Sequence, residues 1–83
     1  MGRKINKKLL AGIAVRIRKL REEKGITQEV FYNDTGIHIG RIESTDRDFS
    51  MSTFEGICDY LEISMEDFLK GVKYTRPKTS KSK

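Results

Sequence analysis

The sequence predicts a compact all-α domain built from five short helices. Apolar residues recur at spacings of three and four, as in Ile13, Ile17 and Leu20, which places them on one helical face. Thr27 and Ser64, two residues that favour helix N-termini, stand before further segments with helical character. No segment shows a convincing strand pattern, so we expect the core to come from helices alone.

The first two helices are bounded by clear signals. The periodic segment predicts a helix over about residues 8–24, with Gly25 as its C-terminal stop. Thr27 then caps a second helix, in which we expect Val30 and Phe31 to face the core.

The last two helices follow a polar loop over residues 44–50. Ser50 or Ser52 caps the fourth helix, whose buried face carries the residues Phe54, Ile57 and Leu61. A fifth helix over about residues 65–70 begins at a capping-box-like Ser64–Asp67 pattern and ends at Gly71. Phe68 is its expected core residue, and Leu69 is a second candidate.

Charge divides the chain into three parts. The net charge of +5 combines +4 in residues 1–8, −4 in residues 9–72 and +5 in residues 73–83. We therefore predict a basic N-terminal arm, a mildly acidic domain and a basic, disordered tail. Basic arms raise the affinity for nucleic acid without reading its sequence. The alternative is that these lysine-rich ends only keep the protein soluble, since such segments have the same composition.

The composition argues against several classes of protein. The single Cys58 excludes an internal disulfide and a multi-cysteine zinc site, and it fits a cytoplasmic setting. We expect Cys58 to be a small buried apolar residue. No stretch approaches the ~20 apolar residues of a membrane span. No nucleophile–base pair, paired carboxylates or phosphate-binding loop is recognisable, so we expect no enzyme, no cofactor, no metal and no small-molecule substrate.

Residues 26–43 have the pattern of a helix-turn-helix, in which the second helix can enter the DNA major groove. From about residue 13 to 70, the sequence resembles the phage-repressor helix-turn-helix family, of the Cro/lambda-repressor-like or XRE type. The matching segments are RIRKLREEKGITQE at 16–29, GRIE at 40–43 and LEIS at 61–64. The resemblance implies a lambda-repressor-like domain whose second and third helices read double-stranded DNA, and it implies a homodimer.

Between Gln28 and Glu43 the chain is about three residues shorter than the usual family pattern, nearly one helical turn. In one arrangement, the second helix ends near Tyr32 and Asp34 caps the third. In the other, the second helix runs to Thr35, Gly36 makes the turn and a short third helix follows. We favour the first arrangement, because it leaves a third helix long enough to reach base edges.

The resemblance and the residue chemistry give candidate DNA contacts. Gln28 matches a position that typically touches phosphate and can brace a side chain of the reading helix. Arg41 can pair with guanine O6 and N7 or hold a phosphate. Three further candidates, Thr35, Gly36 and His38, fall at the expected start of the reading helix. The Thr35 hydroxyl can hydrogen-bond a base, and Gly36 would let the backbone approach a phosphate. We expect His38 to cap the helix or to face a phosphate. For Gln28 and Arg41, a solvated helix residue is the alternative.

The loop after the third helix adds Ser44, Thr45 and Arg47, whose side chains suit contacts with the DNA backbone. Asp46 and Asp48 oppose that role, so a solvated loop is an equal alternative. The resemblance also implies an ion pair between Arg21 and Glu43 that joins the first and third helices.

We therefore expect a sequence-specific DNA-binding transcriptional regulator, acting as a repressor. The alternatives are a protein-interaction module, such as an antitoxin or adaptor, and sequence-independent binding of DNA or RNA through the basic arms.

Overall fold

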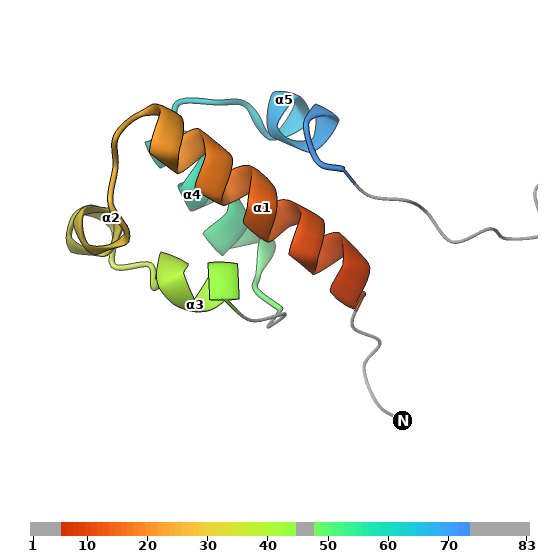
Figure 1. Cartoon of the computed structure of the whole chain (residues 1–83), viewed down its shortest axis with the longest axis horizontal. Coiled ribbons are helices and arrows are strands. Elements are labelled where there is room, and N and C mark those ends of the chain that lie inside the picture. The colour runs from red at the N-terminus through yellow and green to blue at the C-terminus, as the bar shows by residue number, and fades with distance from the viewer. Residues whose placement is uncertain (1–5, 45–47, 74–83) are drawn as a thin grey trace, which may run out of the picture.

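Five helices, in the order expected from the sequence, make up the described part of the chain (Figure 1). The computed structural model describes residues 6–44 and 48–73. The helices are α1 (Lys7–Glu23), α2 (Gln28–Thr35), α3 (Ile39–Ser44), α4 (Met51–Tyr60) and α5 (Met65–Lys70). The described residues form no strand, and none of their helices is long and apolar enough to cross a membrane.

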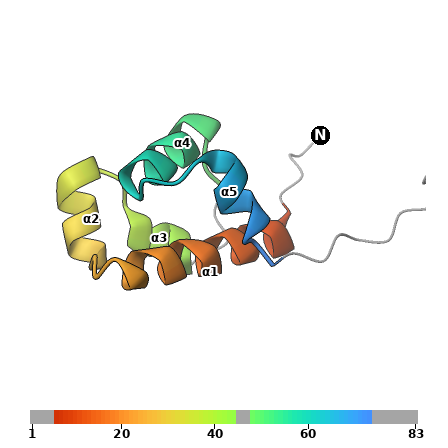
Figure 2. The same cartoon turned by 90° about the horizontal axis from the view of Figure 1, so that it is seen from above.

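The long helix α1 organises the molecule. It runs across the front of the fold with α5 on one side and α3 on the other, while α2 lies near its C-terminal end (Figure 1). Seen from above, α4 lies on the opposite side of the molecule from α1 (Figure 2). Close backbone contacts join α1 to α3, α2 to α3 and α4 to α5.

Side-chain caps fix where the helices begin. Asn6, Thr27, Ser50 and Ser64 each accept a hydrogen bond from the backbone N–H three residues later, at the starts of α1, α2, α4 and α5. These bonds satisfy amides that have no partner within the helix. The expected caps Thr27 and Ser64 are confirmed, and Ser50 rather than Ser52 caps α4.

The core lies where the periodic apolar residues meet. The core contains most of the residues expected from the sequence, with Ile39 from α3 in addition. The expected members are Ile13, Ile17, Leu20, Phe31, Phe54, Ile57, Cys58, Leu61 and Phe68. Phe54 of α4 packs edge-on against Phe68 of α5, with ring centroids 5.0 Å apart. Burial raises the pKa of the Cys58 thiol, which favours its neutral, apolar form.

Two expected core positions are wrong. Val30 and Leu69 are exposed, whereas their neighbours Phe31 and Phe68 are fully buried. Consecutive residues on a helix point about 100° apart, so a short helix buries one member of such a pair. In α2 and α5 the larger aromatic ring occupies the core.

Candidate nucleic-acid interface

The end of α2 differs from the arrangement we favoured. Helix α2 runs to Thr35, and Gly36 follows in the left-handed region at φ 77°. The Thr35 hydroxyl donates to the Phe31 carbonyl at 2.7 Å and accepts from the Ile37 N–H at 3.0 Å. These bonds close the turn, so the expected helix end near Tyr32 and the cap at Asp34 are wrong.

The third helix is correspondingly short. It begins at Ile39, and the His38 carbonyl accepts from the Arg41 N–H at 3.1 Å and from the Ile42 N–H at 3.4 Å. Full burial of Ile39 fixes which side of α3 faces the core. Thr35 and Gly36 therefore belong to the end of α2 and the turn, not to the start of the reading helix.

A buried ion pair holds α3 against α1. The Arg21 guanidinium donates from Nε to Glu43 Oε2 at 2.9 Å and from Nη2 to Glu43 Oε1 at 3.0 Å. The bonds to Glu43 raise the pKa of Arg21 above its usual value, while burial acts in the opposite direction. The pair implied by the family resemblance is present, and its two parallel bonds restrict the orientation of α3.

Helix α2 joins the same network. Gln28 Nε2 donates to Glu43 Oε1 at 3.0 Å, and Arg21 Nη1 donates to the Ile26 carbonyl at 2.8 Å, just before the α2 cap. Gly40 makes room for the Gln28 side chain, because a Cβ at position 40 would lie 3.0 Å from Gln28 Oε1. The start of α2 and the middle of α3 are thus held in one fixed relation.

The outer face of this unit is a shallow hollow between α2 and α3. Gln28, His38, Arg41 and Ser44, four of the expected contact residues, line it together. All four are exposed to solvent. Their amide, imidazole, guanidinium and hydroxyl groups can hydrogen-bond both to phosphate oxygens and to base edges.

Two other expected contact residues, Thr35 and Gly36, lie outside this hollow. The Thr35 hydroxyl is engaged with the backbone, and Gly36 closes α2. Thr45 and Arg47 lie outside the described residues.

Sequence reasoning missed Tyr32, which lines the hollow together with Glu29 and Gly40. The Tyr32 ring stacks on His38, with centroids 4.3 Å apart and planes at 27°. Tyr32 stands four residues after Gln28, a spacing that places both on one face of a helix, so the signal was present. The stack connects the exposed side of α2 to the residue before α3.

Most side chains that line the hollow carry no formal charge. Arg41 is the one basic residue and Glu29 the one acidic residue of its lining. Among residues 6–44 and 48–73, no group of three His, Cys, Asp or Glu side chains is placed to hold a metal ion.

Comparisons with known proteins agree with this arrangement. The sequence model of the Cro/C1-type HTH DNA-binding domain matches residues 16–73. Among solved structures, the wild-type restriction-modification controller protein C.Esp1396I superposes with a TM-score of 0.70 at 31% identity, covering 77% of this chain and 86% of that one.

Two further similar structures contain C.Esp1396I with DNA. Its tetramer in complex with its natural 35 base-pair operator gives a TM-score of 0.67 at 32% identity over 75% of this chain and 86% of that one. The complex with a 25 base-pair operator site gives 0.68 at 32% identity with the same coverage. Curated protein sequences show no significant match. The family match spans most of the chain and includes every element of the α2–α3 unit, and so the chain belongs to the Cro/C1-type helix-turn-helix DNA-binding family.

Proposed function

We propose that this protein is a transcriptional regulator, acting as a repressor, that binds operator DNA in a sequence-specific way through α2 and α3. The observation that carries the proposal is the Arg21–Glu43–Gln28 network. It gives the two helices a fixed mutual orientation while leaving the polar side of α3 exposed. The structural similarity to a controller protein solved on operator DNA supports the same function.

The proposed contacts follow the two helices. Arg41 pairs with a base edge in the major groove, and Gln28 holds a phosphate at the start of α2. His38 and Ser44 flank Arg41, and Tyr32 adds a hydroxyl from α2. Thr35 leaves the contact set because its hydroxyl already donates to and accepts from the backbone.

Phosphate contacts outside the hollow are assigned to basic segments. Thr45, Arg47 and the basic residues of segments 1–8 and 73–83 would add sequence-independent affinity that weakens as salt rises. The Arg41 side of α3 would supply the base preference. The protein acts in this scheme by binding and not by catalysis.

The shortness of α3 favours binding as a dimer. Ile39 is buried and Glu43 is paired with Arg21, so few of the six residues of α3 can reach bases. Two copies related by a two-fold axis double the number of bases read, at half-sites about 34–36 Å apart. We therefore expect a pseudo-palindromic operator.

Selection of bound duplexes from a random pool tests the function. We expect recovery of one motif with two-fold symmetry, and affinity for it that exceeds affinity for random DNA by at least about 10³-fold at physiological salt. Equal affinity for selected and random duplexes would reject sequence reading. Salt-dependent binding without preference would support the arms alone, and no binding would support an interaction module.

A further inference from the structure

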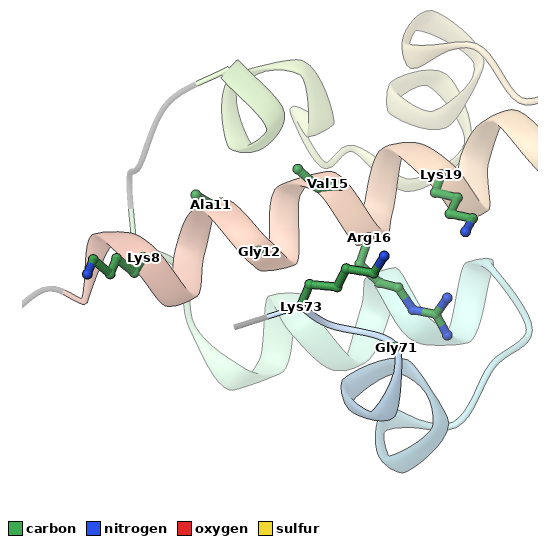
Figure 3. Close-up of a pocket in the computed structure, with 8 residues that line it drawn as sticks. All are labelled: Lys8, Ala11, Gly12, Val15, Arg16, Lys19, Gly71 and Lys73. Carbon is green, nitrogen blue, oxygen red and sulfur yellow. The ribbon is translucent and has the colours of Figure 1, made fainter. Parts of the chain in front are cut away.

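A second surface lies on α1, away from the hollow between α2 and α3. One stripe of α1 carries the residues Lys8, Ala11, Gly12, Val15, Arg16 and Lys19, whose spacings of three and four keep them on one side of the helix. The segment after α5, with Gly71 and Lys73, forms the opposite wall of a groove along this stripe (Figure 3). The groove shares no lining residue with the hollow.

The walls of the groove are held by short contacts. Arg16 Nε donates to the Phe68 carbonyl at 3.1 Å and Nη2 donates to the Asp67 carbonyl at 3.2 Å, at the end of α5. A Cβ at Gly12 would lie 2.8 Å from the Lys73 carbonyl oxygen, so the segment after α5 passes directly over the backbone of α1. The groove is therefore part of the folded domain.

The floor is apolar and the rim is basic. Ala11 and Val15 are exposed on the floor, and Val15 is 67% exposed. Lys8, Lys19 and Lys73 stand around it, and the lining includes no acidic residue. Within the described part of the chain, the ion pairs involve none of these three lysines.

From this juxtaposition we infer that the groove binds an acidic, amphipathic segment of another protein. Apolar side chains of that segment would cover Ala11 and Val15, and its carboxylates would face the three lysines. Burial of the apolar floor would contribute affinity, and attraction between the carboxylates and the three lysines would add charge complementarity.

Other occupants fit less well. Residues 1–7 and 74–83 carry only basic charges and would be repelled by the lysines of the groove. A second copy placed symmetrically would bring the same lysines against this face. Duplex DNA would satisfy the lysines but would leave the apolar floor without a partner.

The test uses the full-length ¹⁵N-labelled protein and a synthetic helical peptide with leucine on one face and glutamate on the other. We expect the peptide to shift the amide resonances of Gly12 and Gly71, and a sequence-matched peptide with lysine in place of glutamate to leave them unchanged. Affinity is read from the same titration and does not depend on whether the protein binds DNA.

Two single variants and one double variant locate the site. Val15→Glu should weaken peptide binding about tenfold or more, because it places a carboxylate on the apolar floor. Met51→Glu is the matched control, since Met51 is 69% exposed on α4, outside the groove, and its change should leave peptide affinity within about twofold. Thermal melting of both variants checks that the fold is intact. A double variant, Lys8→Glu with Lys19→Glu, should lower the affinity in a salt-dependent way.

Three results would overturn the inference. The first is a peptide that does not shift these amides at millimolar concentration, or that shifts them equally in Val15→Glu. The second is a shift caused by duplex DNA of any sequence in place of the peptide, which would make the groove a nucleic-acid surface. The third is a shift caused by raising the protein concentration alone, which would make the groove a contact between copies.

Discussion

Arg21 on α1 and Glu43 on α3 form a doubly hydrogen-bonded ion pair that is almost removed from solvent, with side-chain exposures of 9% and 2%. The same guanidinium binds the Ile26 carbonyl and the same carboxylate accepts from Gln28. One pair of charges therefore connects α1, the start of α2 and the closing turn of α3. The orientation of the proposed DNA-binding surface on α2 and α3 depends on it.

Replacing Glu43 tests the structural part of this relationship. We expect Glu43→Ala to lower the free energy of unfolding by about 3–5 kcal/mol, because it leaves the Arg21 charge buried without its partner. Chemical denaturation measures the loss. Arg18→Ala is the control: Arg18 is 61% exposed and its Nε lies 3.7 Å from Glu43 Oε1, so its change should cost less than about 1 kcal/mol. Similar losses in the two variants would show that the buried pair has no special role.

Gly40→Ala should move stability and DNA binding in opposite directions. Alanine in place of glycine within a helix stabilises it by up to about 1 kcal/mol. The added Cβ would lie 3.0 Å from Gln28 Oε1 and would push that flexible side chain from its place beside Glu43. We expect an unchanged or higher melting temperature together with weaker binding to the selected duplex. Loss of both, or of neither, would contradict the positioning of Gln28 by Gly40.

Gly36 tests the turn between α2 and α3. Its φ of 77° disfavours any residue with a Cβ, although nothing lies within 4 Å of the position that a Cβ would occupy. Gly36→Ala should therefore cost about 1–2 kcal/mol in stability through backbone strain alone. Gly36→Asn should cost less, since asparagine tolerates the left-handed region better. Equal melting temperatures for Gly36→Ala and the unaltered protein would mean that the turn adopts another conformation.

Tyr60 gives the protein a predicted alkaline sensitivity. The Tyr60 hydroxyl donates to Asp34 Oδ2, and this bond is the main reason that the pKa of Tyr60 is raised. A raised pKa in the folded state means that the neutral phenol favours folding. This contribution is complete below the unfolded-state pKa of about 10 and is lost as pH rises through the higher folded-state value.

The comparison that isolates this effect is Tyr60→Phe, which keeps the ring that packs edge-on against Phe31 with centroids 4.7 Å apart. We expect the stability difference between the two proteins to be constant from neutral pH to about pH 10 and to shrink above it. A difference independent of pH across that window would show that the Tyr60 hydroxyl does not stabilise the fold through its protonated form.

Much of the fold follows from local patterns. The spacing of Ile13, Ile17 and Leu20 predicts the buried face of α1, and Thr27 predicts the start of α2, because both signals depend on neighbours along one helix. The end of α2 was not predictable in this way. Thr35 is compatible both with a helix and with the turn that follows one. Where α2 ends depends on the turn at Gly36 and on the burial of Ile39, which involve packing between helices.

The same division applies to the candidate interface. Gln28, His38, Arg41 and Ser44 were predicted as contacts from the helix-turn-helix pattern, and the structure places the four around one hollow. The Tyr32–His38 stack and the groove on α1 were not identified, since each requires knowing how separate elements pack.

The most direct measurement compares Arg41→Ala with removal of residues 73–83, using the selected duplex, a duplex altered at one base pair and random DNA over a range of salt. We expect Arg41→Ala to erase about 1–3 kcal/mol of discrimination at one position of the site. We expect the shortened chain to keep its discrimination but to show a smaller salt slope. Equal weakening on every duplex by both changes would contradict base reading by α3.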